Sequence, residues 1–340
     1  MDDSNKPIIS ICIANFNGED LIGPCLDSVF NQEICAEFEV IVHDDASTDH
    51  SVDYIQKNYT KVMLLRSDSN VGFCTSNNRM AAIARGKYLL LLNNDATLRQ
   101  GALQALLTRA KYIGRSSILG LPQYDMSTGS LVDKGSIFDP FLNPVPITSP
   151  DHRDVGMVSG ACLWISKELW DEIGGFPEYF FNIAEDTYIC FVARLWGYHI
   201  EVVDGSGFDH LIGANIGGGK IKSGKLVTTY RRRYYSERNK SYTMILCYPA
   251  LLLTVIMPFH LILLIMEGMA LSFFLKDKTL LRSIYFRAFS SIWINKKQLF
   301  HDRLRIQSKR CISFCKFTAV IAYLPHKLRL LLRYGVPKII

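Results

Sequence analysis

The first 110 residues of the chain repeat one pattern four times: a short apolar run, a polar turn, and then apolar residues at helical spacing. The apolar runs are PIISICIA, FEVIVH, KVMLLR and KYLLLL. Runs that are apolar at consecutive positions are typical of strands buried on both faces, as in a parallel sheet that helices cover from both sides. The sequence therefore predicts an α/β fold with a mostly parallel central sheet flanked by helices.

The four polar turns should meet at one edge of that sheet, because the carboxyl ends of parallel strands lie together and ligands bind there. No G-x-G-x-x-G follows the first strand and no G-x-x-x-x-G-K-[ST] occurs, so neither a Rossmann dinucleotide site nor a P-loop is indicated. Carboxylates at this edge need a cation between them and any phosphate, and a hard divalent ion at Asp95 meets that need. The acidic and amide residues of the turns are Asn15, Asn17, Asp44, Asp45, Asn70, Asn77, Asn78 and Asp95.

The formal charge of +6 is unevenly distributed along the chain. Residues 276–340 contain fifteen Lys and Arg against two acids, which is +13, so the first 275 residues carry −7. We expect one domain over residues 1–240 and a hydrophobic, basic helical region over 241–340. Nine scattered cysteines, six of them inside apolar runs, predict a reducing compartment, and the acidic start MDDSNKP is not expected to be a signal peptide.

An uncharged stretch of twenty-three residues, 244–266, is long enough to cross a membrane. Pro249, Pro258 and His260 make it a poor straight helix, and a single crossing would export the basic tail against the positive-inside tendency. We therefore predict a peripheral or monotopic region at the cytoplasmic face of the cell membrane, bound to its anionic surface through LLRSIYFRAFSSIWINKK and HKLRLLLRYG. A two-span form with a second crossing at 314–324 is the second choice. A soluble helical subdomain or a dimer interface is the alternative that needs no membrane.

Five segments follow one another along the chain: ISICIANFNGEDLIGPCLDSVFNQ, EVIVHDDASTDHSVDYI, NVGFCTSNNRMAAIARGKYLLLLNNDATL, VSGACLWISKELWDEIGGFPEYFFNIAEDTYICFVARLWGYHI and YYSERN. In this order and spacing, over residues 8–245, they resemble the family 2 inverting glycosyltransferases of GT-A fold, in particular bacterial membrane-associated members of rhamnosyl or galactofuranosyl type. The resemblance implies that 1–240 is a catalytic domain that binds a nucleotide-diphosphate sugar. It also implies transfer of the sugar to a hydroxyl of a lipid-linked saccharide or polysaccharide, with Mn²⁺ or Mg²⁺ as cofactor.

The resemblance assigns roles in the donor site. It implies that Asp45 accepts a hydrogen bond from the base, and that Asp95, as the last carboxylate of the family's Asp-x-Asp motif, binds the metal and the diphosphate. Here the motif is Asn93-Asn94-Asp95, so one carboxylate is missing. His210 in GFDHLIG is the implied second metal ligand, and an imidazole beside a carboxylate suits Mn²⁺ at least as well as Mg²⁺. The predicted donor-binding residues are Asn15, Asn17, Asp45, Asn70, Asn77, Asn94 and Arg238.

The same residues have structural explanations that need no ligand. The stretch DDASTD can form an Asx turn and a helix cap unaided. A lone Asp after a strand caps the next element, and a lone His is a hydrogen-bonded core or surface residue. Both interpretations stay open at the level of sequence.

The segment NIAEDTYICFVARLWGY predicts a helix that begins at its acidic pair and ends at Gly197. Glu185 and Asp186 then occupy the first turn, where acids also favour the helix dipole. Inverting transfer needs a general base for the proton of the acceptor hydroxyl, and the resemblance implies the Asp of this pair. We predict Asp186 as the base and Glu185 as a supporting group.

Farther along the chain, GANIGGGKIKSGK predicts a mobile lid, and TTYRRRYYSERN concentrates arginines. Guanidinium forks match the geometry of phosphate. The arginines would bind the donor diphosphate or a phosphate on the acceptor, and a solvated basic face is the alternative. They are Arg231, Arg232, Arg233 and Arg238.

Two other classes of protein fit parts of the pattern. A nucleotidyltransferase on a related fold should carry a Gly-rich loop near residue 15 and a reactive Lys, and ANFNGEDL offers neither. A non-catalytic sugar- or lipid-binding membrane protein would have no use for Asp95, Asp186 and His210 together. The absence of Q-x-x-R-W disfavours processive polymer synthesis, and residues 120–157 are the predicted specificity insert. No nucleic-acid partner is expected, and no oligomeric state is predicted.

Overall fold

The computed structural model of the chain describes residues 6–149, 155–211, 218–222 and 225–339. The chain divides into two compact units. The first comprises Met1–Ser136, Pro146–Ala193 and Tyr198–Ile212, and the second comprises Ile137–Val145, Arg194–Gly197 and Gly213–Ile340. The predicted boundary between residues 240 and 241 falls inside a helix of the second unit, which takes in the chain from Gly213 onward.

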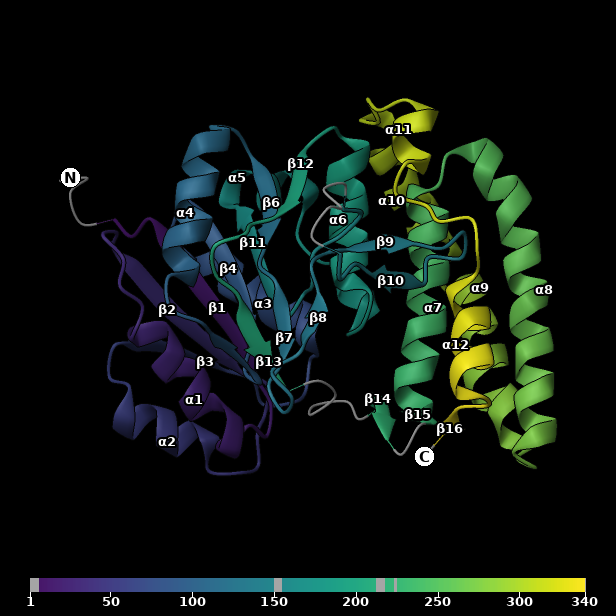
Figure 1. The fold of residues 1–340 in the computed structure, drawn as a ribbon, viewed down its shortest axis with the longest axis horizontal. Helices are drawn as coiled ribbons and strands as arrows, with labels where there is room; N and C mark the ends of the chain where they lie inside the picture. Colours follow the sequence, from purple (N-terminus) through teal and green to yellow (C-terminus); the bar gives the residue numbers. More distant parts are fainter. Residues whose placement is uncertain (1–5, 150–154, 212–217, 223–224, 340) are drawn as a thin grey trace. The chain divides into compact units, whose positions relative to one another are not determined.

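The first unit is built on a seven-stranded sheet with the strand order β12-β6-β11-β4-β1-β2-β3 (Figure 1). Strands β4, β1, β2 and β3 are parallel, β12 is parallel to β6, and β11 is antiparallel to both of its neighbours. In β4 the residues from Tyr88 to Leu92 are all buried, as expected for a strand covered on both faces. The predicted α/β fold is thus confirmed. The bounds are β1 Ile9–Asn15, β2 Phe38–Asp44, β3 Val62–Arg66, β4 Tyr88–Asn93, β6 Ser117–Gly120, β11 Cys162–Ser166 and β12 His199–Val202.

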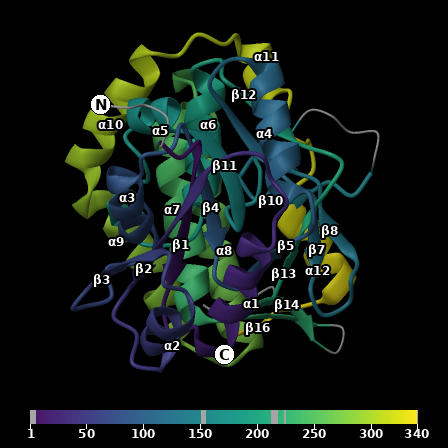
Figure 2. The same ribbon diagram turned by 90° about the vertical axis from the view of Figure 1, so that its left-hand side faces the viewer.

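Helices cover both faces of this sheet. Apolar side chains of α1, α2 and α4 join one face of the strands in a common core, whereas α3 packs on β1 and β2 and α5 on β11. Figure 2 shows α1 and α4 on one side of the strands and α3 and α5 on the other. Burial of each large apolar side chain in these layers contributes about 1.5–3 kcal/mol. The bounds are α1 Glu19–Phe30, α2 Ser51–Asn58, α3 Phe73–Ile83, α4 Ala102–Ile113, α5 Lys167–Ile173, the 3₁₀ turn η2 Glu178–Phe180 and α6 Glu185–Leu195.

A smaller sheet of the first unit has the order β5-β13-β7-β8 and begins just after β4. Strand β13 pairs antiparallel with β5 and parallel with β7, and His210 stands opposite Ala96 in the register. This pairing brings His210 next to Asp95, 115 residues earlier in the chain. The bounds are β5 Ala96–Leu98, β7 Gln123–Asp125, β8 Leu131–Asp133 and β13 Phe208–His210. A separate pair, β9 Ser136–Phe138 and β10 Pro144–Pro146, lies mostly in the second unit.

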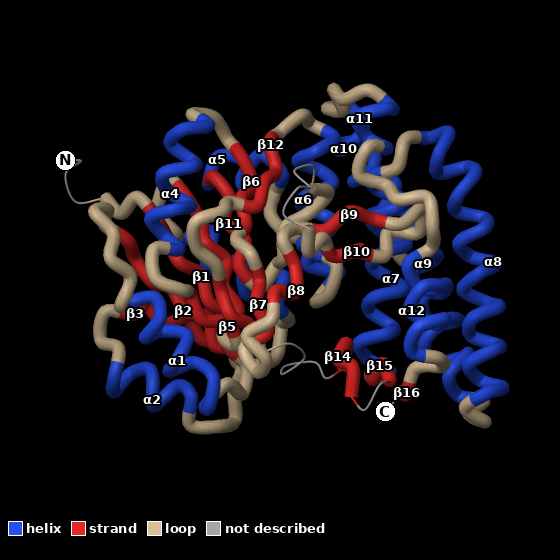
Figure 3. The backbone as a smooth tube through the Cα atoms, in the orientation of Figure 1, coloured by secondary structure: helices blue, strands red, loops and turns tan. Residues whose placement is uncertain are grey.

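The second unit consists mainly of helices, shown blue in Figure 3. Helix α7 packs against α8, α9 and α10, and β14, β15 and β16 form a small sheet. The predicted lid lies partly outside the described residues, and its described part forms β14 and the first residue of β15. The bounds are β14 Gly218–Lys222, β15 Lys225–Thr228, α7 Tyr230–Cys247, α8 Ala250–Phe274, the π-helical η3 Leu281–Phe286, α9 Arg287–Ile294, α10 Lys296–Ser308, α11 Phe314–Thr318, α12 His326–Tyr334 and β16 Lys338–Ile339.

Five charged side chains form a network between α7, α8 and α12. Glu237 pairs with Lys240 at 2.9 Å and with Lys327 at 2.7 Å, and Glu267 pairs with Lys327 at 2.7 Å and with Arg233. Burial raises the pKa of Glu237, but the charges of Lys240 and Lys327 outweigh burial and hold that pKa well below its ordinary value. Removing one partner from a buried ion pair typically costs ~3–5 kcal/mol. The network therefore fixes α12 to α7 and α8.

The uncharged stretch 244–266 is not one continuous helix. Helix α7 ends at Cys247, and α8 begins after Pro249 and continues through Pro258. Among the described residues, α8 is the one helix long and apolar enough to cross a membrane, with 11% of its most apolar window buried. The predicted second crossing, 314–324, contains the five-residue helix α11, far short of the ~20 residues that a span needs. Exposed apolar residues of α8 are Leu251, Val255, Phe259, Ile262, Leu263, Ile265, Met266, Met269, Phe273 and Phe274.

Candidate active site

One asparagine ties together the ends of β1, β2 and β4. Asn15 Nδ2 donates to Asp44 Oδ1 at 3.0 Å and to Ser51 Oγ at 2.9 Å, and Asn15 Oδ1 accepts from Asn94 Nδ2 at 2.9 Å. Gly18 closes over this pair, since a Cβ there would lie 2.3 Å from both Asn15 Oδ1 and Asn94 Nδ2. Asn15 and Asn94, both predicted to bind the donor, thus hold the carboxyl edge of the sheet in shape.

The carboxylates of the DDASTD turn bind two different parts of the backbone. Ser47 N donates to Asp44 Oδ2, three residues earlier, at 3.1 Å, and Ser51 N donates to Asp49 Oδ1, two residues earlier, at 3.1 Å. The second bond is an Asx turn, and the first ties the turn to the end of β2. Asp45 is turned toward a different loop. The structural explanation therefore accounts for Asp44 and Asp49.

Asp45 accepts backbone N–H groups with both carboxylate oxygens, from Val71 at 2.7 Å and from Gly72 at 2.8 Å. Gly72 has a φ of 89°, and a Cβ at this position would lie 2.6 Å from the Phe181 ring, so only glycine fits. Asp45 thus orders the loop between β3 and α3. That loop in turn packs against the segment just before α6.

Three of the other predicted donor residues lie around the same edge. Asn17 Oδ1 accepts from Thr48 N at 2.8 Å, and Asn77 Nδ2 donates to the carbonyl one turn earlier in α3 at 2.9 Å. Asn70 is exposed in the loop between β3 and α3. Arg238, by contrast, belongs to the second unit. The structure gathers every predicted donor residue except Arg238 within the first unit.

Asp95 and His210 meet where β4 passes into β5. His210 Nε2 lies 3.1 Å from Asp95 Oδ1, and the two side chains are 14% and 3% exposed. The other ring nitrogen, Nδ1, lies 3.0 Å from Gln123 Nε2. The structure therefore brings the two predicted metal ligands together, with Gln123 orienting the ring from behind.

The donor atoms of this pair fit a divalent cation. Two ligands at right angles around one octahedral ion lie about 3 Å apart when each bond is ~2.1 Å, and the observed separation is 3.1 Å. A half-turn of the Gln123 amide places its oxygen at His210 Nδ1, which then carries the proton and leaves the Nε2 lone pair for a metal. Nearby in sequence, Asn93 Oδ1 is buried without a hydrogen-bond partner among the described residues. The described residues contain no group of three or more His, Cys, Asp or Glu around one point, so further ligands would be amide, water or phosphate oxygens.

Asp186 stands in the first turn of α6 with both oxygens hydrogen-bonded. Gly160 N donates to Asp186 Oδ2 at 3.1 Å and Thr187 N donates to Oδ1 at 2.6 Å. Burial raises the pKa of Asp186 in spite of these donors. A raised pKa lies closer to neutral pH, and a general base is most effective when its pKa is near the pH at which the enzyme works. Glu185, the predicted supporting group, is buried beside it in the chain.

The backbone just before α6 is strained. Phe181, Ile183 and Ala184 have φ values of 65°, 72° and 67°, a region that non-glycine residues rarely adopt and β-branched residues almost never. Such conformations cost ~1–3 kcal/mol each and gather at functional sites. The strain directly precedes Glu185 and Asp186, and it favours a functional role over simple helix capping.

Strand β11 connects Asp186 to the end of β4. Gly160, which donates to Asp186, is followed by Ala161, whose carbonyl accepts from Asn93 N at 3.0 Å. Asn93 ends β4 two residues before Asp95. The predicted base in α6 is therefore linked, through the residues that lead into β11, to the end of β4 beside the predicted cation site.

Asp133 on β8 is a candidate that sequence reasoning missed. Ser136 Oγ donates to Asp133 Oδ2 at 3.1 Å, while Oδ1 is buried with no hydrogen-bond partner among the described residues. Burial raises the pKa of Asp133 to about 7, and the charge of Asp186 adds to the effect. A carboxyl that titrates near neutrality within electrostatic reach of the predicted base is a functional candidate. No sequence signal marked it, because it lies in the irregular segment 120–157.

Replacing Asp133 with Asn should change how stability depends on pH. With a folded pKa of about 7 against ~3.9 when unfolded, the folded protein binds more protons between these values, so its stability falls as pH rises through that window. The free energy of unfolding of the Asn variant should not fall in this way. Compared with the unchanged protein, the variant should be more stable at pH 8 than at pH 5 by on the order of a few kcal/mol. Urea unfolding at both pH values measures it. The exposed carboxyl of Asp204, replaced by Asn, is the control, and equal pH slopes in all three proteins would contradict the assignment.

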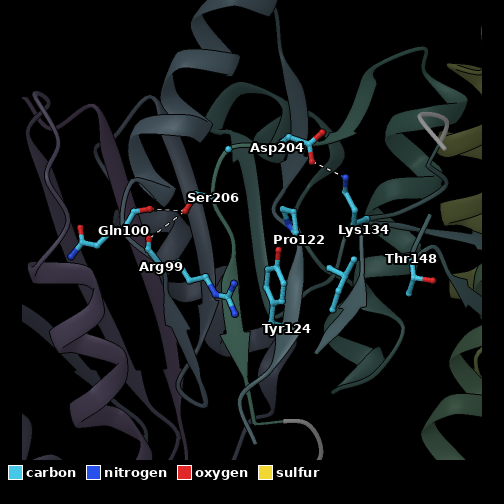
Figure 4. Close-up of a pocket in the computed structure, with 10 residues that line it drawn as sticks. Arg99, Gln100, Pro122, Tyr124, Lys134, Thr148, Asp204 and Ser206 are labelled. Atoms are coloured by element: carbon cyan, nitrogen blue, oxygen red, sulfur yellow. Dashed lines mark hydrogen bonds and ion pairs between the residues drawn. The ribbon is translucent and has the colours of Figure 1, made fainter. Parts of the chain in front are cut away.

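A surface recess of about 630 Å³ lies on the other face of the small sheet (Figure 4). Tyr124 alternates along β7 with Gln123, the partner of His210, so Tyr124 points to the opposite face. The Arg99 guanidinium lies 3.5 Å from the centre of the Tyr124 ring. The predicted specificity insert therefore shapes a recess on the face away from His210. Its lining includes Pro122, Tyr124, Leu131, Lys134 and Thr148 from the insert.

Comparison with known proteins agrees with this geometry. Residues 10–174 match the sequence model of the family described as glycosyl transferase family 2. Over 100 residues the chain is 39% identical to the poly(ribitol-phosphate) beta-glucosyltransferase of Bacillus spizizenii, covering 28% of this chain and 16% of that protein. Over 178 residues it is 28% identical to the N-acetylglucosaminyl-diphospho-decaprenol L-rhamnosyltransferase of Mycobacterium tuberculosis, covering 44% and 58%. The chain thus spans less than two thirds of the length of these relatives.

Solved structures resemble the chain in fold. S. aureus TarS 1-349 in complex with UDP-GlcNAc is 17% identical with a TM-score of 0.54, over 88% of each chain. The mannosyltransferase PcManGT from Pyrobaculum calidifontis, in complex with GDP-Man and Mn²⁺, is 15% identical with a TM-score of 0.51, over 91% of this chain and 87% of that one. The resemblance seen in the sequence is confirmed by the family match, and the GT-A fold by these structures.

Proposed function

Because residues 10–174 of this chain match the sequence model of glycosyl transferase family 2, we propose that it moves a sugar, with inversion, from a nucleotide-diphosphate sugar to a hydroxyl of a lipid-linked saccharide or polysaccharide. The observation that carries the proposal is the meeting of Asp95 with His210 at 3.1 Å, in the same unit as Asp45 after β2 and Asp186 in α6. A binding protein needs no buried carboxylate with a raised pKa beside a cation site.

Different side chains of the first unit would bind the base, the metal ion and the diphosphate of the donor. Asp45 and the loop that it orders take the base of the donor, and Asp95 with His210 would hold a divalent ion. When bound, Mn²⁺ or Mg²⁺ supplies positive charge to the diphosphate of the donor and to the leaving group. PcManGT was solved with Mn²⁺, which supports a divalent cofactor in this fold.

Asp186 takes the proton of the acceptor hydroxyl as the hydroxyl oxygen attacks the anomeric carbon. The new bond joins that carbon to the acceptor oxygen, and the bond to the diphosphate oxygen breaks. Its electron pair leaves with the nucleoside diphosphate. Attack from the side opposite the leaving group inverts the anomeric configuration. Glu185, in the same helical turn, supports the base.

A lipid-linked acceptor would require the chain to work at a membrane. The mycobacterial relative is named for a diphospho-decaprenol substrate, and here α8 exposes a broad apolar surface in a unit that carries the basic tail. Exposed apolar patches bordered by basic residues are typical of surfaces that bind anionic membranes. We place the chain at the cytoplasmic face, where nucleotide sugars are made, as a monotopic or peripheral protein.

A donor panel tests the function. Thermal unfolding of the full-length chain is measured with UDP-GlcNAc, GDP-mannose and dTDP-rhamnose, each with and without Mn²⁺. One donor should raise the melting temperature only when Mn²⁺ is present, and that donor should be consumed once a lipid-linked saccharide is added. Pyrophosphate release from a nucleoside triphosphate and a sugar phosphate would indicate a nucleotidyltransferase instead. Lipid binding with no donor effect would indicate a non-catalytic binder.

A further inference from the structure

Arginine and tyrosine side chains alternate along α7 and α9 in the second unit. The side chains follow one another in the order Arg231, Tyr235, Arg238, Tyr234 and Arg287. The guanidinium carbon of each arginine lies 4.3 to 5.8 Å from the centre of each tyrosine ring next to it in this order. We call this set the Arg–Tyr ladder. Its two end arginines are exposed and the middle one is half-buried. The ladder therefore presents positive charge to solvent along a rigid aromatic support.

The ladder concentrates its charge around one ring. Arg238 and Arg287 stand 5.2 and 4.3 Å from the centre of the Tyr234 ring, so their charges interact within the Debye length of about 10 Å at 0.1 M salt. Burial raises the pKa of Tyr234, but hydrogen bonds from Ser291 and Arg238 and the two arginine charges hold that pKa below its ordinary value. Two like charges at one ring favour an anion with more than one charge.

The arginines of the RRRYYSER segment lie in two different environments. Arg233 Nε donates to Tyr285 Oη at 3.1 Å and its guanidinium pairs with Glu267, so Arg233 belongs to the ion network inside the unit. Arg231 and Arg238 lie on the ladder. Arg287 completes the ladder from α9, outside the segment that suggested phosphate binding.

An exposed apolar strip borders the ladder. Phe286, Trp293 and Ile294 are 48%, 72% and 77% exposed. At about 100° per residue these three fall on a helix face next to that of Arg287. Lys296 Nζ lies 3.5 Å from the centre of the Trp293 ring. Aromatic and aliphatic side chains beside basic ones are typical of a helix lying in a membrane interface.

We propose that the Arg–Tyr ladder binds the diphosphate of the lipid-linked acceptor, with Phe286, Trp293 and Ile294 contacting the first part of its lipid chain. The substrate class rests on the proposed function, while the site itself rests on the ladder. Guanidinium forks pair with phosphate oxygens through two parallel hydrogen bonds, and two arginines suit two linked phosphates. A soluble phosphate would leave the apolar strip without a role, which is why we choose a lipid-borne one.

Vesicle binding by the full-length protein tests the site. Phosphatidylcholine vesicles are used alone, with polyprenyl diphosphate, or with phosphatidylglycerol, and Arg287→Ala is compared with Arg282→Ala, an exposed arginine one turn away in η3. On diphosphate vesicles, Arg287→Ala should weaken binding about tenfold or more, as expected for loss of charged hydrogen bonds, and Arg282→Ala should change it little. On phosphatidylglycerol vesicles both should lose about fivefold, the general effect of one basic residue. Arg231→Ala, also exposed, serves as a second ladder variant should Arg287→Ala fold poorly.

Three results would overturn the proposal. Equal losses by Arg287→Ala and Arg282→Ala on diphosphate vesicles would mean general attraction to charge. Binding of inorganic pyrophosphate as tight as binding to diphosphate vesicles would mean a soluble ligand. Weaker nucleotide-sugar binding by Arg287→Ala, measured by calorimetry, would place the ladder at the donor, where Arg238 was predicted. Failure of the unchanged protein to bind any donor, with the ladder results as expected, would remove the proposed function and leave the lipid site standing.

Discussion

Replacing Asp186 with Asn is expected to lower the rate of sugar transfer by ~10²–10⁴-fold and to leave donor affinity almost unchanged. The acceptor hydroxyl must lose its proton as it attacks, and a side-chain amide does not accept that proton. Initial rates at saturating donor measure the first quantity, and calorimetry with the donor measures the second. Loss of rate with donor affinity intact distinguishes a base from a residue that only shapes the donor site.

The same variant has a predictable effect on stability. Asp186 accepts the N–H of Gly160 on one oxygen and that of Thr187 on the other. Asn keeps one acceptor and turns its NH₂ group toward the other donor, which should cost ~1–3 kcal/mol. That loss lowers the melting temperature without unfolding a domain of ordinary stability. The control is Asp171→Asn, an exposed helical acid paired with Lys167, whose transfer rate should not change.

The pH dependence of transfer gives an independent check on Asp186. Burial raises its pKa, and only the ionised carboxylate accepts a proton. The value of kcat/KM should therefore rise with pH through a point above the ordinary carboxyl pKa of ~3.9. This limb should be missing from the residual activity of the Asn variant. Near-normal turnover by that variant would remove Asp186 from the mechanism and make Glu185 the candidate base.

Residues 88–97, YLLLLNNDAT, show how far local pattern reaches. The continuous apolar run predicts a strand buried on both faces, and the structure has β4 at Tyr88–Asn93 with Asp95 just beyond its end. Both the burial of the run and the polar residues at its end can be predicted from residues adjacent in the sequence. Local pattern alone therefore predicts the strand and the edge at which we expect ligands to bind.

Partners distant in the chain could not be predicted in this way. The contact between His210 and Asp95 depends on β13 pairing with β5, and Gln123 joins it through β7. The resemblance to a family supplied His210, but no pattern supplied Gln123 or Asp133. Likewise Arg287 meets the ladder only because α9 packs on α7. Such side chains lie in irregular or unmarked segments, and their roles come from long-range packing.

Some predicted residues have structural roles that sequence could not separate from binding. Asn15 and Asn94 are predicted to contact the donor, and both are buried in hydrogen bonds that join strand ends. By joining the strand ends, these two side chains hold the residues of the candidate site in place, whether or not they contact a ligand themselves. Their direct contact with the donor stays a prediction.

Replacing Asp95 with Ala is expected to remove the effect of Mn²⁺ on nucleotide-sugar binding, with a loss in affinity of at least about 100-fold. Loss of groups behind a metal ligand already costs ~10–100-fold in metal affinity, and Asp95 is the carboxylate of the pair that would hold the ion. As a metal ligand His210 is neutral, so without Asp95 the protein supplies no negative charge to hold the divalent ion. Calorimetry of the donor with and without Mn²⁺, on both proteins, measures the difference.

The nucleoside of the donor, without its phosphates, is the matched control for Asp95. In the proposed site its binding would depend on Asp45 and the loop at Val71 and Gly72, so it should be the same in both proteins and insensitive to Mn²⁺. Loss of nucleoside binding in the variant would mean that the strand edge has collapsed, and His210→Gln would then replace it as the test. An equal gain from Mn²⁺ in the variant and the unchanged protein would place the cation elsewhere. The 3.1 Å contact between Asp95 and His210 would then be a structural hydrogen bond, and the diphosphate would need another source of positive charge.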